Sequence, residues 1–312
     1  MRMLKWATAA WLCCVCFSGA LEIRLLEPTV IEPDPAGPIT LSYGTHERNT
    51  LDLWSAAGDE PHPLLIYIHG GGWTSGDKSQ VDGRVNIDYW LAKGVSVASI
   101  DYRYSTDAIL PVPVHDAVHA VQFLKYNAQT LKLDPDRFAL QGGSAGGCSS
   151  LYILFHDDLA DPSATDPVLR ESTRVAGVFG QFPQTSIHPD TLNEWIGVEA
   201  ASYPMIYIAV GAASYVELTN NIASYETLLY EFSPISHMDA NDPPLYLSYP
   251  SDMTLPAATA AAAIHHGMFG VKLKEQADTI GYTNCTLSIP GTVDAVINST
   301  TFLETILFGQ TE

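Results

Sequence analysis

The chain has 312 residues, of which 46% are hydrophobic, and it carries 35 acidic against 15 basic side chains, a net charge of −20 at pH 7. This length and apolar content are enough for one large α/β core, and no internal repeat or low-complexity stretch divides the chain. The strongly negative surface excludes nucleic acid and anionic membranes as partners.

The first 20 residues have the pattern of a secretory signal peptide. Arg2 and Lys5 precede an apolar run, which ends in the small residues Ser18-Gly19-Ala20 that favour cleavage. The run is short for a membrane span, and its retention as an N-terminal anchor is the alternative. Residues 21–36, rich in proline and glutamate, are predicted to be an extended arm. We therefore expect a secreted or periplasmic protein with no membrane involvement beyond export.

Residues 37–312 are predicted to form one domain in which strands and helices alternate. Short apolar runs indicate strands, and apolar residues at helical spacing indicate helices. We expect strands at 39–43, 50–54, 64–69, 95–101, 137–141, 175–179, 245–249 and 285–289, and helices at 114–131, 147–156, 269–280 and 300–307. The first two strands are expected to pair antiparallel. The alternation that follows predicts a mostly parallel, eight-stranded sheet with helices on both faces.

The stretch from about 181 to 232 is rich in tyrosine and is long for a simple connection between two strands. It is therefore predicted to be a helical cap over a site. Aromatic residues in such a segment more often pack the cap than contact a substrate.

The run Gly142-Gly143-Ser144-Ala145-Gly146-Gly147 lies between a predicted strand and a predicted helix. This is the G-x-S-x-G pattern of a nucleophile elbow, in which small neighbours let a serine occupy a strained turn with its hydroxyl exposed. Ser144 is therefore the candidate nucleophile. A serine hydroxyl is a poor nucleophile unless a base takes its proton, so the base decides whether the protein is an enzyme.

A second glycine run, Gly70-Gly71-Gly72, follows the apolar strand that ends at His69. Glycine lets the amide groups there turn toward a bound carbonyl. Together with the amide of Ala145, the amides of Gly71 and Gly72 would form an oxyanion hole, which is often the largest single contribution to acyl transfer.

Together these motifs resemble the α/β-hydrolase superfamily, in particular the hormone-sensitive-lipase-like esterases and the BD-FAE-like feruloyl and acetyl esterases. The resemblance covers about residues 48–308 and rests on His69-Gly70-Gly71-Gly72-Trp73, Asp101-Tyr102-Arg103, Gly142 to Gly147, and Asp242-Pro243-Pro244. It implies an α/β-hydrolase fold and hydrolysis of carboxylic esters by a Ser-Asp-His triad without a cofactor. The expected substrates are small-molecule or polysaccharide esters with small or aromatic acyl groups.

The resemblance places the triad acid in the loop after the seventh strand. There Asp252-Met253-Thr254-Leu255-Pro256 matches the family's Asp-x-x-Val-Pro pattern with leucine in place of valine, which makes Asp252 the expected acid. The His-Gly pair that usually precedes this aspartate is replaced by Tyr249-Pro250.

The histidine departs from the family pattern. The family carries it in the turn after the final strand, but residues 290–295 contain none, and no histidine follows His266. Because a triad is recognised by geometry, the base can come from another loop. His265 is the expected base and His266 its alternative, since 264–270 resembles an Ile-His-x-x-x-Phe-Gly stretch of relatives.

Two other possibilities stay open at this point. A histidine of the cap, His237 or His188, would be recruited as the base. Alternatively no histidine reaches Ser144, and the protein binds a carbohydrate or an ester without cleaving it.

No metal site is predicted. Adjacent histidines such as His265 and His266 rarely chelate one ion together, and no acidic or cysteine residue stands at ligand spacing around them. Cys148 and Cys285 either form one disulfide or remain buried thiols, and the position of Cys148 at a buried helix start favours thiols. The oligomeric state is not predicted.

Overall fold

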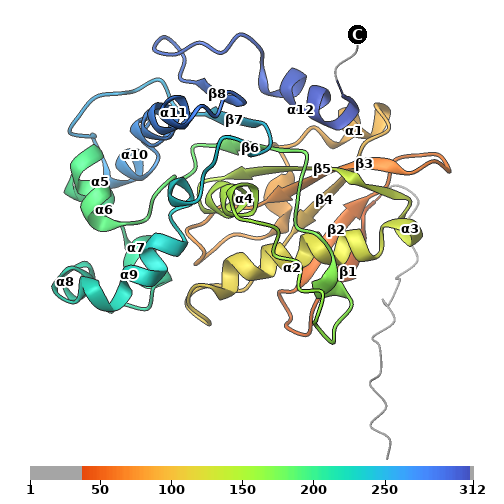
Figure 1. The fold of residues 1–312 in the computed structure, drawn as a ribbon, viewed down its shortest axis with the longest axis horizontal. Helices are drawn as coiled ribbons and strands as arrows, with labels where there is room; N and C mark the ends of the chain where they lie inside the picture. The colour runs from red at the N-terminus through yellow and green to blue at the C-terminus, as the bar shows by residue number, and fades with distance from the viewer. Residues whose placement is uncertain (1–36, 310–312) are drawn as a thin grey trace, which may run out of the picture.

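The computed structural model describes residues 37–309, so the predicted signal peptide and arm lie outside the described residues. An eight-stranded sheet crosses the molecule, and helices cover both of its faces (Figure 1). The strand order is β1-β2-β4-β3-β5-β6-β7-β8. The strands are β1 (Ile39–Ser42), β2 (Thr50–Trp54), β3 (His62–Ile68), β4 (Ser96–Ile100), β5 (Leu133–Gly143), β6 (Gly177–Gln181), β7 (Leu245–Ser248) and β8 (Cys285–Ser288).

The pairing directions follow the predicted class. β1 pairs antiparallel with β2, and β2 antiparallel with β4, while every later pair is parallel. The central strands are apolar almost throughout, because a parallel sheet is covered on both faces. In β3, for example, Leu64, Leu65 and Ile66 are all fully buried. The predicted mostly parallel sheet with helices on both faces is confirmed.

The helices divide between two cores. The larger core holds α2 (Val112–Tyr126), α4 (Ala145–Phe155) and α11 (Met268–Ile280) on one face of the sheet. The smaller core holds α1 (Ile87–Ala92) and α12 (Ser299–Phe308) on the other. The helix expected at 114–131 is interrupted at Asn127, whose side-chain amide donates to the carbonyl of Phe123, and α3 (Ala128–Leu131) follows.

Five helices lie between β6 and β7, in the segment for which the sequence predicts a cap. They are α5 (Pro189–Trp195), α6 (Val198–Ala201), α7 (Pro204–Ala209), α8 (Tyr215–Asn220) and α9 (Ile222–Glu231). Figure 1 shows them at one end of the molecule, beside the carboxyl end of the parallel strands. A short helix that the sequence did not predict, α10 (Ala260–Ile264), lies in the connection between β7 and α11.

Within residues 37–309, no helix combines the length and the apolar character needed to cross a bilayer. Cys148 and Cys285 are both buried and both free, as the position of Cys148 favours.

Candidate active site

Ser144 occupies the sharp turn between β5 and α4. Its backbone has φ 53° and ψ −125°, a strained conformation for a residue with a side chain, and its amide donates to the carbonyl of Gln181 at 2.9 Å. A Cβ atom on Gly146 would lie 2.1 Å from the carbonyl oxygen of Ile68, so this position requires glycine. The local sequence thus forms the predicted elbow, and the hydroxyl of Ser144 faces a pocket.

The second glycine run lies directly against this elbow. A Cβ atom on Gly70 would lie 2.9 Å from the carbonyl oxygen of Gly143, and Gly71 and Gly72 have φ angles of 111° and 62°. Within residues 37–309, the amides of Gly71 and Gly72 take no part in hydrogen bonds. The amide of Ala145 is in the first turn of α4, where it has no intrahelical acceptor. Three amide groups are therefore available beside Ser144.

The carbonyl of Gly71 holds the loop in shape through hydrogen bonds from Thr74 and Ser75. It accepts the amides of Thr74 at 3.0 Å and Ser75 at 3.1 Å, and also both of their hydroxyls. Behind the loop, the fully buried His69 stacks on Tyr102 with ring centroids 4.1 Å apart. The Tyr102 hydroxyl donates to the carbonyl of His69 at 2.9 Å.

Asp101 and Arg103 each anchor this region through a different partner. Asp101 accepts the amide of Lys78 at 2.8 Å and pairs with Arg48 at 3.3 Å. Arg103 binds Asp116 through two nitrogens, at 2.6 and 2.8 Å. These two ion pairs fix the residues that support the glycine loop.

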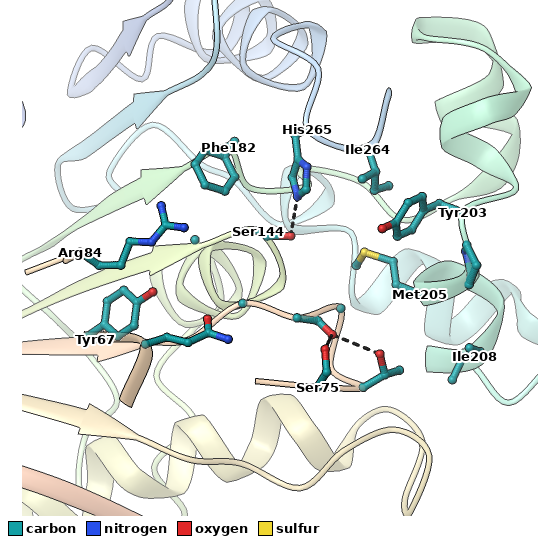
Figure 2. Close-up of a pocket in the computed structure, with 17 residues that line it drawn as sticks. Tyr67, Ser75, Arg84, Ser144, Phe182, Tyr203, Met205, Ile208, Ile264 and His265 are labelled. Atoms are coloured by element: carbon teal, nitrogen blue, oxygen red, sulfur yellow. Dashed lines mark hydrogen bonds between the residues drawn. The ribbon is translucent and has the colours of Figure 1, made fainter. Parts of the chain in front are cut away.

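His265 is the histidine that reaches the serine. Its Nε2 lies 2.9 Å from the Oγ of Ser144, as Figure 2 shows, and its Nδ1 lies 2.9 Å from the carbonyl oxygen of Ala261. A carbonyl only accepts hydrogen bonds, so Nδ1 carries the ring proton and Nε2 is left to accept the serine proton. The ring of Phe182 meets the imidazole edge-on, with centroids 5.2 Å apart.

Burial lowers the pKa of His265 below its usual value of 6.5, and the bond to Ala261 acts in the opposite direction. The imidazole is therefore neutral at pH 7 and able to take a proton. A neutral base with a free Nε2 beside a serine is the arrangement that nucleophilic catalysis requires.

Asp252 does not take the position expected of the acid. It is exposed, and its carboxylate accepts the amide of Thr254 at 3.0 Å in a turn of its own loop, which lowers its pKa. The Nδ1 of His265 is occupied by a backbone carbonyl instead. The physical reason is α10, which follows Asp252 in the chain and ends at Ile264, so that its own Ala261 carbonyl binds the imidazole of His265.

The other candidate histidines lie elsewhere. His266 is buried, and its Nδ1 accepts the amide of Met268 at 3.1 Å. In the cap, His188 contacts Glu226 at 3.2 Å, and His237 contacts the carbonyl of Glu231 at 3.0 Å. Among the histidines of the described part of the chain, only His265 contacts the hydroxyl of Ser144.

The pocket over Ser144 has a volume of about 480 Å³. Figure 2 shows that two sides of this pocket differ in chemical character. One is apolar and comes from the cap and α10, with Tyr203, Met205, Ile208 and Ile264. The other comes from β3, the residue after β6 and the segment before α1, with Tyr67, Phe182 and Arg84. Trp73 is buried and donates to the Ser149 hydroxyl, so it packs behind the site.

The BD-FAE family matches residues 51–261, which is more than half of the chain. The chain belongs to the BD-FAE family. A versiconal hemiacetal acetate esterase of Dothistroma septosporum is 33% identical over 40% of this chain and 36% of its own length. A probable carboxylic ester hydrolase, LipM, of Mycobacterium tuberculosis is 28% identical over 66% of this chain and 46% of its own length. The chain therefore spans less than half the length of these two curated relatives.

Solved structures agree on the α/β-hydrolase fold. An acetyl ester-xyloside bifunctional hydrolase from Caldicellulosiruptor lactoaceticus superposes with a TM-score of 0.59 at 20% identity, over 76% of this chain and 75% of that one. The predicted fold class and the predicted BD-FAE resemblance are thus both confirmed. The BD-FAE match contains Ser144 and the glycine loop, but it ends before His265.

This BD-FAE chain carries three site features that the sequence did not reveal. They are the carbonyl of Ala261, the ring of Phe182, and Arg84. Phe182 follows β6 at the carboxyl edge of the sheet, where ligands bind in open α/β sheets, so its position was a usable signal. The carbonyl of Ala261 could not be found in this way, because every residue has a backbone carbonyl and no residue type in the sequence indicates its role.

One group of possible metal ligands occurs within residues 37–309, formed by His156, Glu231 and His237. Its ligand atoms lie within 4.8 Å of one another, at the end of α4 that is remote from Ser144. The three side chains already bind one another and the backbone, with His156 Nε2 3.1 Å from Glu231 Oε1. None of them lines the pocket over Ser144.

Proposed function

We propose that the protein is a serine carboxylesterase that forms an acyl-enzyme on Ser144. The observation that carries this proposal is the 2.9 Å contact between the Nε2 of His265 and the Oγ of Ser144. It favours hydrolysis over simple binding, because a hydrolase fold without a base has no group to remove the serine proton. The curated relatives, named as ester hydrolases, support the same class.

In the proposed reaction, the Oγ of Ser144 attacks the ester carbonyl carbon while its proton passes to the Nε2 of His265. The negative oxygen of the tetrahedral intermediate accepts hydrogen bonds from the amides of Gly71, Gly72 and Ala145. The intermediate collapses, and the leaving alcohol takes the proton from His265. Water then attacks the acyl-enzyme by the same route, which releases the acid and restores Ser144.

The proposed substrates are esters of small acyl groups, acetyl esters above all. The name of the Dothistroma relative specifies an acetate ester, and the Caldicellulosiruptor protein is an acetyl ester-xyloside bifunctional hydrolase. A pocket of about 480 Å³ with an apolar side also accommodates an aromatic acyl group. We propose export to the periplasm or the medium, where an acylated polysaccharide would be within reach.

The test is hydrolysis of 4-nitrophenyl acetate by the wild type and by two variants. Ser144→Ala and His265→Ala should each lower kcat by roughly 10⁴-fold to 10⁶-fold, because either change removes the nucleophile or its base. His188→Ala and His237→Ala are the matched controls and should retain activity. In the wild type, kcat/KM should fall as the pH drops through a pKa below 6.5, because protonated His265 accepts no proton.

Full activity in both Ser144→Ala and His265→Ala would refute the mechanism. Loss of activity in His237→Ala or His188→Ala with retention in His265→Ala would assign the base to the cap instead.

A further inference from the structure

One side of the pocket carries a cation and hydrogen-bond donors beside the ring of Phe182. Arg84, Tyr67 and Gln80 all line it, and no acidic side chain lines any part of the pocket. In a chain with 35 acidic and 15 basic residues, a pocket wall with an arginine and no carboxylate is unusual. Figure 2 places Arg84 and Tyr67 on the side of Ser144 opposite Met205 and Ile208.

Arg84 differs from the other arginines in what its side chain binds. Within residues 37–309, its guanidinium makes neither an ion pair nor a hydrogen bond, and it lies 5.9 Å from the centre of the Phe182 ring. The other arginines of this part of the chain all bind a carboxylate or a backbone carbonyl; they are Arg48, Arg103, Arg137, Arg170 and Arg174. The positive charge of Arg84 is thus available to a ligand.

The backbone of Arg84 is nevertheless held in place. Its carbonyl accepts the side-chain amide of Gln141 at 3.0 Å, and Gln141 is a buried residue of β5. Its amide donates to the carbonyl of Val81 at 3.0 Å. The sheet therefore fixes the point from which the guanidinium reaches into the pocket.

Tyr67 provides an independent sign that a ligand belongs here. Only 2% of Tyr67 is exposed in β3. Its hydroxyl borders the pocket and makes no hydrogen bond to any residue of the described range. Figure 2 shows the hydroxyl directed into the pocket on the side of Arg84. Burial raises the pKa of Tyr67, so the phenol stays protonated and donates. The ring is buried while the hydroxyl is open to the pocket, so a group bound in the pocket is the partner available to it.

We propose that Arg84 and Tyr67 form an anion subsite, and that the ester cleaved by Ser144 carries a carboxylate on the part of the molecule that lies over them. This inference rests on the proposed esterase function and names its substrate class. Arginine is the side chain best suited to a planar carboxylate, which it binds through two parallel hydrogen bonds. The hydroxyl of Tyr67 would donate a third hydrogen bond to this carboxylate.

The net negative charge of the protein does not prevent an anionic ester from binding beside Arg84. At physiological salt, charges beyond about 8 Å are largely screened, so the nearest cation dominates binding. The distant acidic surface acts mainly on the rate of encounter.

The test compares esters that differ only by methylation of a carboxylate. 4-Nitrophenyl hydrogen adipate and its methyl ester place the charge on the acyl side, whereas 4-acetoxybenzoate and its methyl ester place it on the leaving alcohol. In at least one pair, the wild type should prefer the anion, and the pair that shows the preference identifies which part of the ester faces Arg84.

Arg84→Gln should lower kcat/KM for that anion by roughly 10- to 100-fold, the usual worth of a hydrogen bond to a charged group. The loss for the neutral methyl ester should be smaller, so that the ratio of kcat/KM for the anion to that for the methyl ester falls. Tyr67→Phe should act in the same direction with a smaller effect. Arg137→Gln, at the amino end of β5, removes the same charge far from the site and should leave the preference unchanged.

Equal effects of Arg84→Gln on the charged and neutral members of both pairs would overturn the anion subsite while leaving the esterase intact. Binding to Ser144→Ala provides a reading without turnover. In at least one of the two pairs, calorimetry should show tighter binding of the anion than of its methyl ester, and this difference should disappear in Ser144→Ala/Arg84→Gln. Equal binding of the anion and its methyl ester in both pairs would also overturn the proposal, whether or not Ser144 proves catalytic.

Discussion

At the scale of single residues, the proposed base, His265, is oriented by the main chain. A carboxylate beside the imidazole would both fix its tautomer and stabilise the cation that forms when it takes a proton. The carbonyl of Ala261 fixes the tautomer equally well, but it contributes only a partial negative charge. His265 follows the last residue of α10, where the carbonyl end of the helix is negative, so the sign of the local field is favourable.

The first consequence concerns Asp252. Asp252→Asn should change kcat/KM by less than about fivefold, because an exposed carboxylate that is not on the imidazole contributes little. A carboxylate that orients the base is worth about 10⁴-fold in a serine protease. Rates with 4-nitrophenyl acetate distinguish the two, with Asp294→Asn in the turn after β8 as the matched control. A loss of several thousandfold in Asp252→Asn alone would show that the loop after β7 rearranges to reach His265.

Patterns in the sequence predict some site residues well and others poorly. The conformations of Ser144 and the glycine loop are set by close backbone contacts that only glycine permits, so they are visible in the sequence as runs of glycine. The Asp-x-x-Leu-Pro match at Asp252 describes a loop, and nothing in it reports the five-residue helix that follows. His265 was found by its place in the chain order, whereas its partner Ala261 acts through an atom that every residue has.

At the scale of elements, the cap forms part of the oxyanion region itself. A Cβ atom on Gly72 would lie 2.9 Å from the Cβ of Met205, so α7 packs directly on the glycine loop. Pro204, Met205 and Ile208, all from α7, line the pocket. The position of one short helix therefore sets both the depth of the apolar side and the space beside the oxyanion amides.

Met205→Ala should extend the apolar side and shift the preference toward longer acyl groups. Each added methylene that becomes buried is worth about 0.8 kcal/mol, or about fourfold in rate. The ratio of kcat/KM for 4-nitrophenyl hexanoate to that for the acetate should therefore rise by roughly 10-fold or more. Val216→Ala, on the exposed face of α8, is the matched control. An unchanged ratio would place the acyl group on another side of the pocket.

The sequence predicts the strands more accurately than the short helices. Apolar runs such as Leu64 to Ile68 are bounded by polar or glycine residues, so their limits are visible. α10 consists of four alanines and an isoleucine, and its residues carry no apolar periodicity that marks a helix of this length. Tertiary position, rather than local pattern, decides its conformation.

At the scale of the whole molecule, stability should depend on pH through buried histidines. Burial lowers the pKa of His69 to about 4, from 6.5 in the unfolded chain. Burial also lowers the pKa of five further histidines, namely His115, His119, His156, His265 and His266. Between pH 6.5 and 4 the unfolded chain binds more protons at these groups than the folded protein does, so acidification favours unfolding.

The free energy of unfolding should therefore fall as the pH drops from 6.5 toward 4. His69 alone would account for about 3 kcal/mol of this fall. Asp242 acts in the opposite direction, because burial raises its pKa to about 6 and the folded state then binds the extra proton. Urea titrations at several pH values should show a shallower dependence in His69→Phe and a steeper one in Asp242→Asn. A slope unaltered in His69→Phe would contradict the prediction.

The placement of His265 directly after α10 makes the proposed reaction depend on a helix of only five residues. Only Ala263 and Ile264 of α10 are buried, and its first turn is held by the hydroxyl of Thr259, which accepts the amide of Ala262 at 3.1 Å. Local opening of so small an element costs far less than unfolding the sheet. Each such opening withdraws the proton acceptor while Ser144 stays in place. Heating should therefore lower the rate of ester hydrolysis reversibly, at temperatures where the fold is still intact.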